Sequence, residues 1–367
     1  MNTSEMDFEG GMDKNFMRRA LVLARRGIGT SHPNPRVGAV VVLGNRIIAE
    51  GWHVGPGCAH AEVIALGQAG ADSKDATLYV TLEPCSSHGR TPPCTEAILQ
   101  AGIKRLVYAS SDSNPLMSGG GCYLEDRGVE VQGGVLRKQA DKLNRPFFHF
   151  IETGMPYVIA KAAISLDGKI ATHLKNSQWI SSEQSRRHAH RLRATSDAVL
   201  IGSGTLRHDN PSLAIRHAKP RGKSPLRVVL CRDTPVCRVD YHLLDKSAPA
   251  RLYVRRLNAH AADWKKAGVE IIEVRSLQEA LKHLAADGRL SLLLEGGGQL
   301  HAAFLENRLS HELFLYQAPI LIGGREAPGL WHGTGVPHLA QVLRLECAER
   351  RRLGEDQLIR SKIVYPD

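Results

Sequence analysis

Apolar positions along the first 150 residues recur in two spacings, one typical of helices and one typical of short buried strands. Helical spacing runs over Phe16–Arg26. A polar Gly44-Asn45 turn between two apolar runs, 37–43 and 46–50, predicts a β-hairpin. Further strands are predicted at 77–82 and 104–109, and further helices at 60–70, 95–101 and 136–150. Strands that alternate with helices in this way predict a layered α/β domain.

A break in the pattern between Arg145 and Pro156 contains proline and glycine and predicts a domain junction. The apolar pattern then restarts with a strong strand over Tyr157–Ile164. Beyond it, a helix is predicted at 182–194, and strands are predicted at 198–201, 226–230, 252–254, 290–294 and 312–316. We therefore expect a flexible tail over residues 1–15, a first α/β domain over 16–150 and a second α/β domain over 156–367.

Composition favours small anionic partners. The chain of 367 residues has a formal net charge of +11, whereas aromatic residues make up only 5%. Its basic residues are dispersed and no stacking platform is visible, so phosphorylated metabolites are favoured over nucleic acid. The seven cysteines lack disulfide-framework spacing, and no segment resembles a signal peptide or the roughly 20 apolar residues of a membrane span. We expect a cytoplasmic protein without nucleic-acid or membrane partners.

Candidate metal ligands lie in and just before the stretch Thr81–Cys94. Cys85 and Cys94 are expected at helix starts, which favour the thiolate form that binds a soft metal. Upstream, His60-Ala61-Glu62 completes the order His-x-Glu, Pro-Cys, Cys of zinc nucleobase and nucleoside deaminases. Three protein ligands, His60, Cys85 and Cys94, leave one position of zinc open for water, as in catalytic sites. Glu62 is the expected general base and acid, which takes a proton from that water and delivers it to the ring nitrogen and the departing ammonia.

Two points of this metal site stay open. Residues at i and i+2 do not share a helix face, so His60 and Glu62 can converge on a metal only off the N-terminus of their helix. Cys58, two residues before His60, is an alternative ligand. The remaining cysteines are expected to be packing residues, namely Cys122, Cys231, Cys237 and Cys347.

The two thiols are separated by an insertion, Ser86–Pro93, that the general deaminase signature lacks. An insertion beside the metal must lie over the pocket, and this one carries His88 and Arg90. With His-Pro-Asn-Pro at 32–35 and His-Ala-Glu at 60–62, the stretch closely resembles the deaminase half of the bifunctional riboflavin-biosynthesis deaminase–reductases.

That resemblance implies a cytidine-deaminase-like three-layer domain in which Asn34, His88 and Arg90 contact the substrate. The family hydrolytically deaminates 2,5-diamino-6-(5-phosphoribosylamino)pyrimidin-4-one with zinc, and then reduces the ribosyl group to ribityl with NADPH. Two positions depart from the family pattern. Ser87 stands where His usually follows Cys-Ser, and Gly120 stands where Gly-Arg-Gly is common.

The second half carries glycine turns that suit a bound phosphate. Glu295-Gly296-Gly297-Gly298 joins an apolar strand to a helix predicted at 299–306, and Gly202–Thr205 is a second turn of this kind. Glycines at such turns let a phosphate approach the N–H groups of a helix N-terminus. Neither turn is the Gly-x-Gly-x-x-Gly fingerprint, so a simple tight turn remains an equal alternative for each. Two such turns in one domain suit a dinucleotide.

The same resemblance covers this half at residues 161–168, 177–180, 209–213 and 295–297, and implies a reductase related to dihydrofolate reductase in fold. It places at the NADPH site Ala163, Trp179, Thr205, Asp209, Gly297 and Gly298. It places at the substrate site Lys161, Ser177, Arg193, Leu213, Arg216 and Glu295, with the two arginines pairing with phosphate. Arg232, where the family often has serine, is a hypothetical contact of the cofactor's 2′-phosphate.

The sequence thus predicts a two-domain enzyme that binds zinc, NADPH and a small phosphorylated pyrimidine, and the family suggests a dimer or tetramer. One alternative is an RNA or nucleoside deaminase with a nucleic-acid-binding second domain. Another is a non-catalytic binding protein stabilised by zinc. For the proton of the reduction, Asp209 is the first candidate, with Lys161 and Glu295 as rivals.

Overall fold

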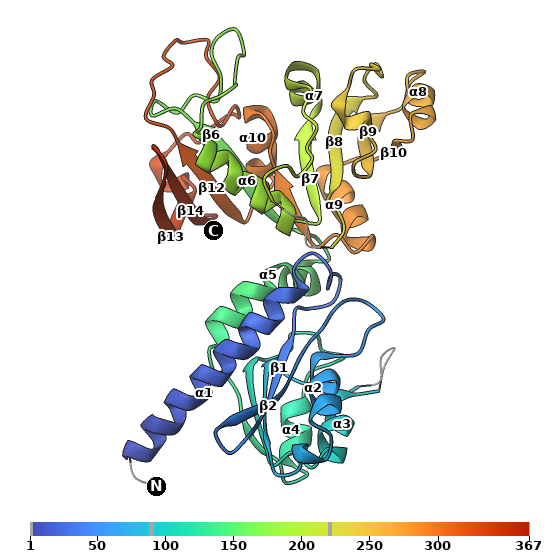
Figure 1. Ribbon diagram of the computed structural model, residues 1–367. Helices are drawn as coiled ribbons and strands as arrows, with labels where there is room; N and C mark the ends of the chain where they lie inside the picture. Colours follow the sequence, from blue (N-terminus) through green and yellow to red (C-terminus); the bar gives the residue numbers. More distant parts are fainter. Residues whose placement is uncertain (1–2, 88–91, 219–221, 367) are drawn as a thin grey trace. The chain divides into compact units, whose positions relative to one another are not determined.

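The structure is a computed structural model that describes residues 3–87, 92–218 and 222–366, with side chains from residue 11 onward (Figure 1). The chain separates into two compact units, Met1–Gly154 and Met155–Asp367. Each unit has its own sheet and its own hydrophobic core, as separate domains do. Within the described residues, no helix combines the length and the apolar content needed to cross a membrane.

The first unit is built on a five-stranded sheet with the order β2-β1-β3-β4-β5. Its strands are β1 (Gly38–Leu43), β2 (Arg46–Trp52), β3 (Thr77–Leu82), β4 (Arg105–Ser110) and β5 (Glu130–Gln132). β1 pairs antiparallel with β2 and β3, whereas β3, β4 and β5 run parallel. The carboxyl ends of β3 and β4 therefore lie at one edge of the sheet, where the loops that follow them can meet.

Helices cover both faces of this sheet, which gives the expected three layers. One face is covered by α1 (Thr3–Ala24) and α5 (Arg137–Thr153), and the other by α2 (Ala61–Ala69), α3 (Cys94–Gln100) and α4 (Gly120–Glu125) (Figure 1). Two 3₁₀ turns, η1 (Arg25–Gly27) and η2 (Gly70–Ser73), follow α1 and α2. Gly51 of β2 allows α2 to pack closely, because a Cβ there would lie 2.3 Å from the carbonyl oxygen of Ala61. The first turn of α2 is thereby held against the sheet.

The amino-terminal segment differs from the prediction of a flexible tail over residues 1–15. Helix α1 already begins at Thr3. The side chain of Asp13 is buried, and its carboxylate accepts hydrogen bonds from Tyr79 Oη at 2.7 Å and from the guanidinium of Arg105 at 2.9 Å. These bonds attach the segment to the sheet. A buried carboxylate satisfied by distant donors leaves no trace in the spacing of apolar residues, which explains the error.

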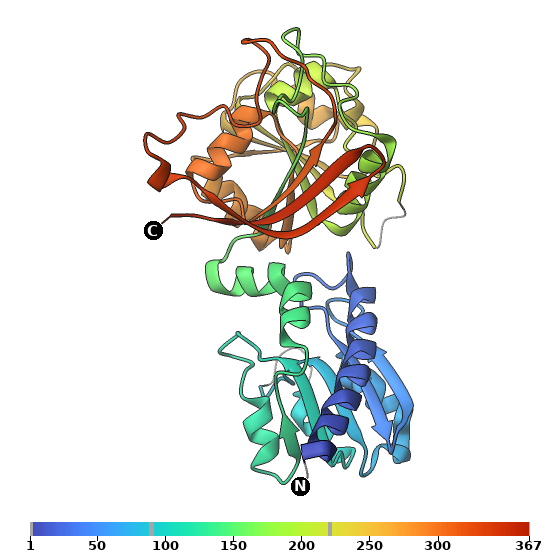
Figure 2. The ribbon, with the colours of Figure 1, turned by 90° about the vertical axis from the view of Figure 1, so that its left-hand side faces the viewer.

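The second unit is built on a nine-stranded sheet with the order β10-β9-β8-β7-β11-β6-β12-β14-β13. Its strands are β6 (Tyr157–Ile164), β7 (Ala198–Gly202), β8 (Leu226–Asp233), β9 (Ala250–Arg256), β10 (Glu270–Glu273), β11 (Ser291–Leu294), β12 (Glu312–Gln317), β13 (Arg344–Leu353) and β14 (Asp356–Val364). The strands from β10 to β12 in sheet order are all parallel. The β13–β14 hairpin extends the sheet antiparallel beyond β12 and faces the viewer in Figure 2.

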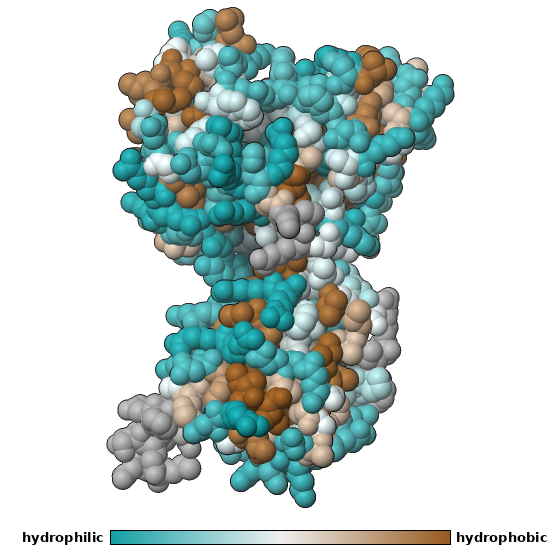
Figure 3. Space-filling model, viewed as in Figure 1, coloured by the Kyte–Doolittle hydropathy of each residue, from teal (hydrophilic) through white to brown (hydrophobic). Residues whose placement is uncertain are grey.

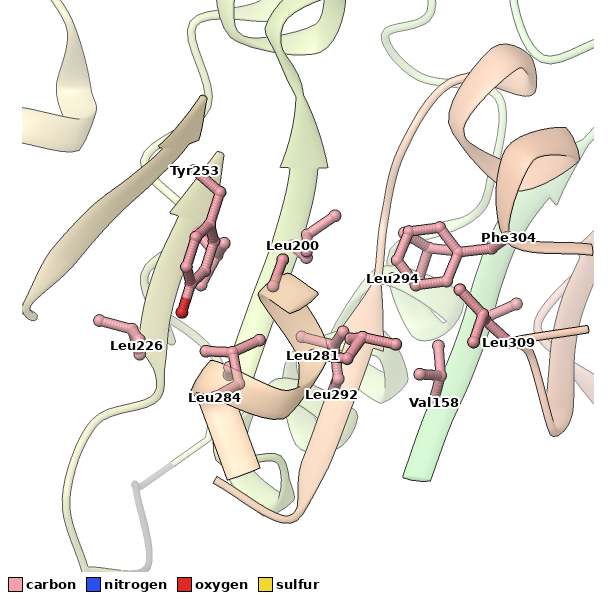
Figure 4. Packing of buried hydrophobic residues seen from close by; sticks show 14 of the residues in the cluster. Val158, Leu200, Leu226, Tyr253, Leu281, Leu284, Leu292, Leu294, Phe304 and Leu309 are labelled. Atoms are coloured by element: carbon pink, nitrogen blue, oxygen red, sulfur yellow. The ribbon is translucent and has the colours of Figure 1, made fainter. Parts of the chain in front are cut away.

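Helices lie on both faces of this sheet as well. They are α6 (Glu183–Thr195), α7 (Ser203–Asp209), α8 (Ala261–Lys266), α9 (Leu277–Ala286) and α10 (Gly298–Glu306), with 3₁₀ turns η3 (His242–Leu244) and η4 (Leu339–Gln341). α6 and α8 pack on one face, and α9 and α10 on the other. Figure 4 shows the core under α9 and α10, where Leu281, Leu284 and Phe304 pack against Val158 and Leu292. Parallel strands place their carboxyl ends, and the loops that follow, at one edge.

The apolar pattern located most of these elements but not all of them. β5 and β10 are short, and β13 is exposed or half-exposed along its whole length, so none of them presents a periodic apolar face. α4 begins in a run of glycines, and α8 is only six residues long. α9 is different, because it follows a Ser276 cap and has apolar residues at helical spacing. The signal for α9 was present in the sequence.

Candidate active sites

Three predicted ligands converge in the first unit. The ligand atoms of His60, Cys85 and Cys94 all lie within 4.8 Å of one another. His60 Nδ1 is 3.0 Å from Cys94 Sγ and 3.7 Å from Cys85 Sγ. One imidazole nitrogen and two thiol sulfurs are a donor set that suits zinc, and three ligands leave a position open. We call these three residues the zinc cluster.

Local backbone structure explains how the zinc cluster forms. His60 is the residue that caps the N-terminus of α2, Cys94 is the first residue of α3, and Cys85 lies in the loop after β3. The expectation that both thiols begin helices is thus wrong for Cys85. Its sulfur nevertheless faces a helix N-terminus, because the N–H of Cys94 donates to Cys85 Sγ at 3.3 Å. His60 and Glu62 both belong to the start of α2, so their side chains can converge on a metal that lies off the N-terminus of this helix.

The two thiols differ in acidity. A hydrogen bond from Cys94 and a weaker one from His60 outweigh burial and lower the pKa of Cys85 to about 4. The same bond, together with burial, raises the pKa of the Cys94 thiol. In the absence of a metal the pair therefore holds one thiolate and one thiol. A metal ion that binds here displaces the remaining proton.

Glu62 is buried, with a relative exposure of 4%. Burial raises the pKa of its carboxyl, and the opposing effect of His60 is smaller. A carboxyl with a raised pKa is a stronger base than an ordinary carboxylate and can later release the proton, which is what a general base that also acts as an acid requires.

The zinc cluster opens on a cavity of about 610 Å³. Asn34 and Ser87 line its wall together with Glu62. Cys58 also lines the cavity but is exposed and does not belong to the group of converging ligands. The predicted substrate contacts His88 and Arg90 lie outside the described residues. Lining residues that sequence reasoning missed are His53, Glu83, Asp112, Asn114, Met117 and Phe147.

A chain of hydrogen bonds orients Asn34 at the cavity wall. His53 Nδ1 is 3.2 Å from the carbonyl oxygen of Ala59, which can only accept, so this nitrogen carries the proton. In the neutral ring Nε2 is then an acceptor, and it lies 3.0 Å from Asn34 Nδ2. Burial lowers the pKa of His53, consistent with a neutral ring. One N–H of the Asn34 amide is thus used within the protein, and the orientation of the amide leaves its oxygen as an acceptor for a ligand.

Two buried polar side chains hold the loops around the cavity. Asn144 of α5 accepts the N–H of Arg36 at 2.8 Å and donates to the carbonyl oxygen of Arg36 at 3.0 Å, which fixes the loop that contains Asn34. The Glu83 carboxylate accepts N–H groups from Asp112, Gly119 and Gly121. In sequence, an acidic residue directly before Pro-Cys was the available signal for Glu83.

The Gly120 departure has a structural consequence. A Cβ at this position would lie 1.9 Å from the carbonyl oxygen of Pro84, the residue before Cys85. In this chain the start of α4 therefore packs directly on the backbone next to Cys85 of the zinc cluster. A side chain at position 120 would need that backbone to move.

In the second unit, the predicted substrate residues Lys161, Arg193 and Glu295 form one charged group. Arg193 Nε and Nη2 donate to the Glu295 carboxylate at 2.6 and 2.8 Å, and Lys161 Nζ lies 3.7 Å from it. Burial alone would raise the pKa of Glu295, but Arg193 and then Lys161 outweigh it and lower this pKa to about 2. Arg193 also donates to the carbonyl oxygen of Ala214, so most of its donors serve the protein rather than a free phosphate.

The other predicted substrate residues, Ser177, Leu213 and Arg216, differ from one another in exposure and in hydrogen bonding. Ser177 Oγ donates to Asp209 at 3.4 Å, and burial raises the pKa of Asp209. Leu213 is 2% exposed and packs in a hydrophobic cluster, so only its backbone can face a ligand. Arg216 is exposed, and its N–H donates to His190 Nδ1.

The residues predicted to line the NADPH site lie at one edge of the second sheet. Thr205 follows β7, Gly297 and Gly298 follow β11 at the start of α10, and Arg232 is near the end of β8. Ala163 stands close to the end of β6. Trp179, in the loop before α6, is 62% exposed, and the Arg186 guanidinium lies 4.6 Å from its ring centre. Ligands of parallel sheets bind at this edge.

Comparisons with known proteins match both units of the chain. Residues 11–110 match the cytidine and deoxycytidylate deaminase zinc-binding region, and residues 156–359 match the RibD C-terminal domain. The riboflavin biosynthesis protein RibD of Bacillus amyloliquefaciens is 42% identical over 356 residues, which cover 94% of this chain and 95% of that protein. RibD of Aquifex aeolicus is 41% identical over 352 residues, which cover 95% of this chain and 98% of that protein.

Two solved structures are similar over nearly the full length. Form 1 of Acinetobacter baumannii RibD is 36% identical with a TM-score of 0.87, and the match covers 97% of this chain and 99% of that one. The diaminohydroxyphosphoribosylaminopyrimidine deaminase/5-amino-6-(5-phosphoribosylamino)uracil reductase of Thermotoga maritima is 33% identical with a TM-score of 0.87, covering 97% and 100%. With a two-unit fold, a zinc cluster beside a buried glutamate and these relatives along its length, the chain belongs to the RibD family of riboflavin biosynthesis proteins.

Proposed function

We propose that the chain is a bifunctional enzyme of riboflavin biosynthesis whose two units catalyse consecutive steps. The unit Met1–Gly154 hydrolytically deaminates 2,5-diamino-6-(5-phosphoribosylamino)pyrimidin-4-one, and the unit Met155–Asp367 reduces the ribosyl group of the product to ribityl with NADPH. The observation that carries the first step is the zinc cluster with buried Glu62 beside it at the wall of one cavity. Membership of the RibD family supports the second step.

His60, Cys85 and Cys94 would hold the zinc ion. A bound zinc ion would supply a Lewis acid, which lowers the pKa of a water molecule to about 7. Glu62 accepts one proton as water adds to the amino-bearing ring carbon and passes it to the ring nitrogen. It then accepts the proton of the newly added hydroxyl group and delivers it to the nitrogen that leaves as ammonia, as the ring carbonyl forms. Its raised pKa fits both halves of this task.

The cavity wall provides the contacts that select the substrate. Asn34, whose amide nitrogen is bonded to His53, presents its oxygen to a donor such as an amino or ring N–H group. The insertion Ser86–Pro93 brings Ser87 to the wall. We assign His88 and Arg90 of the same insertion to the phosphoribosyl part of the substrate, because both can bind an anion.

In the second unit the charged group around Glu295 holds the sugar. Glu295 stays ionised and so accepts hydrogen bonds from hydroxyl groups. Lys161, Arg216 and the unused donors of Arg193 attract the phosphate, and Ser177 and the backbone of Leu213 complete this site. NADPH, held by Ala163, Trp179, Thr205, Asp209, Arg232, Gly297 and Gly298, supplies the hydride. Asp209 is our choice for the proton, since burial raises its pKa.

We further propose a cytoplasmic homo-oligomer, either a dimer or a tetramer. All seven cysteines are free thiols, which suits a reducing compartment. Loops of the second unit expose the apolar side chains of Leu174, Leu321 and Leu339, and hydrophobic patches interrupt the mostly hydrophilic surface in Figure 3. Such patches are typical of subunit interfaces. Light scattering of the purified protein would give its mass, and a monomer would contradict the proposal.

Assays of the two steps with separate substrates test the proposed function. Glu62→Ala should abolish ammonia release from the diaminopyrimidine but leave NADPH oxidation with the deaminated pyrimidine intact, and Asp209→Ala should do the reverse. Glu96→Ala, in the first turn of α3, and Asp263→Ala, in the first turn of α8, are matched controls and should affect neither step. NADPH oxidation without the deaminated pyrimidine, or deamination of RNA by the wild type, would contradict the proposal.

A further inference from the structure

Two arginines lie side by side at the carboxyl edge of the second sheet. β8 and β9 are parallel neighbours in which Cys231 is paired with Val254 and Asp233 with Arg256. This register places Arg232 next to Arg255. Both arginines are exposed, and among the described residues neither guanidinium has a hydrogen bond or an ion pair. Like charges at directly neighbouring strand positions destabilise a sheet, so an anion at this point would be favourable.

The next residue of each strand provides a contrast. Asp233 and Arg256 form an ion pair in which Arg256 Nε lies 2.7 Å from Asp233 Oδ1. Successive residues of a strand point to opposite faces, so this satisfied pair and the two unpaired arginines lie on different faces of the sheet. The two strands therefore carry three arginines near their carboxyl ends. The charge of Arg256 is neutralised by Asp233, whereas Arg232 and Arg255 have no such ion pair among the described residues.

The unpaired arginines lie on the face that also carries the start of α10. Tyr253 and Val228, two and four residues before them on the same face, belong to the core under α9 and α10. In sheet order β7 alone stands between β8 and β11, the strand that leads into α10. With neighbouring strands about 4.8 Å apart, β8 is about 10 Å from β11 along this edge. One nucleoside spans such a distance.

We propose that Arg232 and Arg255 together bind the 2′-phosphate on the adenosine of NADPH and thereby select NADPH over NADH. This inference rests on the proposed reductase function, in which the pyrophosphate lies at the Gly297–Gly298 start of α10. The adenosine then extends across the end of β7 toward β8 and β9. A phosphate dianion between two guanidinium groups relieves their repulsion and accepts charge-assisted hydrogen bonds from both. An arginine is the residue type that accommodates a 2′-phosphate in dinucleotide sites.

Binding measurements that do not depend on catalysis test the pair. Calorimetric titrations of the full chain with NADPH, NADH, 2′,5′-ADP and 5′-ADP would be compared for the wild type, Arg232→Ala, Arg255→Ala and the double variant. Each single substitution should lower the affinity for NADPH and for 2′,5′-ADP about tenfold. The affinities for NADH and 5′-ADP should change less than about twofold. The double variant should lose most of the preference for the 2′-phosphate. Added salt should weaken the binding of NADPH more than that of NADH, and this difference should be larger in the wild type than in the double variant.

Arg256→Ala is the matched control, because it removes an arginine of the same strand that faces the other way and is already paired. It should leave all four affinities unchanged. Arg255→Lys should retain most of the preference for NADPH, which separates loss of charge from misfolding. The inference fails if Arg255→Ala keeps the wild-type ratio of NADPH to NADH affinity, or if both dinucleotides weaken equally. A wild type that binds neither dinucleotide would overturn the reductase function itself, and the inference with it.

Discussion

Glu62 and Glu295 are both buried, yet their surroundings give them opposite acidities. Among the residues that the structure describes, Glu62 forms no ion pair, and burial raises its pKa. Glu295 receives two hydrogen bonds from Arg193 and has Lys161 nearby, which lowers its pKa to about 2. The first therefore holds a proton more readily than an ordinary glutamate, whereas the second remains a fixed anion. Burial alone does not decide what a carboxylate does, because the presence of a paired cation reverses its effect.

The two sites also differ in how the chain assembles them. The zinc cluster and Glu62 come from one loop and the first turns of two helices that pack on the same face of a sheet. The reductase site collects side chains and turns that follow β6, β7, β8 and β11, separated by more than a hundred residues. Hydrogen bonds to backbone and amide groups arrange the first site, including those that the Glu83 carboxylate accepts from backbone N–H groups, whereas ion pairs between side chains arrange the second. Substitutions that preserve the shape of a side chain but remove its charge should therefore affect the two sites differently.

Glu62→Gln is expected to give the largest effect. Loss of a general base and acid should lower the deamination rate between about a hundredfold and ten-thousandfold. The variant should retain zinc, because the three ligands are untouched, and its free energy of unfolding should not fall, because a buried charge has been replaced by a neutral amide of the same shape. Rate, metal content and urea unfolding would be measured. A strongly destabilised variant would mean that Glu62 is a paired structural anion like Glu295.

Glu295→Gln should act mainly on stability. It leaves Arg193 charged and largely buried without its partner, which is expected to lower the free energy of unfolding by about 3 kcal/mol and to abolish the reduction step. Glu183→Gln removes an exposed carboxylate that pairs with Arg187, and this control should change stability by less than about 0.5 kcal/mol. Unfolding of the second unit followed in urea would compare the two variants. Equal stability of both would show that the buried ion pair is dispensable.

The zinc cluster could be predicted because its residues belong to an ordered sequence motif. The spacing of His60, Cys85 and Cys94 predicted that these residues come together, as they do in the structure. Strands such as β3 and β6 could be located to the residue from their apolar runs. Residues that support the motif through long-range hydrogen bonds could not be found in this way. Asn144 is an example, because it meets Arg36 across 108 positions of the chain.

The reductase site was less predictable for a related reason. Arg193 looked like a free phosphate ligand, and only the fold shows that Glu295, 102 positions away, occupies its donors. The neighbouring positions of Arg232 and Arg255 follow from the register of β8 and β9, which a single sequence does not contain. Sequence spacing reports local periodicity, whereas pairing across a sheet or between helices depends on the tertiary structure.

The difference in stability between the wild type and Glu295→Gln should become smaller as the pH falls. The pKa of Glu295 in the folded protein, about 2, lies below its ordinary value of 4.5. A group with a lowered folded pKa stabilises the protein above the unfolded value, and this contribution is lost as pH falls toward the folded value. The stability gap between wild type and variant should thus be constant above pH 4.5 and shrink between pH 4.5 and 2. Unfolding in urea at a series of pH values would measure it, and a gap that widened in acid would reverse the sign.

Asn144→Ala should give the smallest effect and acts only on the first site. The substitution removes two hydrogen bonds to the backbone of Arg36 and leaves those groups buried, which should lower the free energy of unfolding by about 1 to 2 kcal/mol. The freed loop carries Asn34 at the cavity wall, so the KM for the diaminopyrimidine should rise while the rate at saturation changes little. Asn15→Ala, an exposed position, is the control. Because these bonds join neutral groups, the rise in KM should not depend on salt, whereas the ion pairs around Glu295 should respond to it. A rise in KM, relative to wild type, that itself changed with salt would show that the bonds of Asn144 act through charge and would remove this difference between the two units.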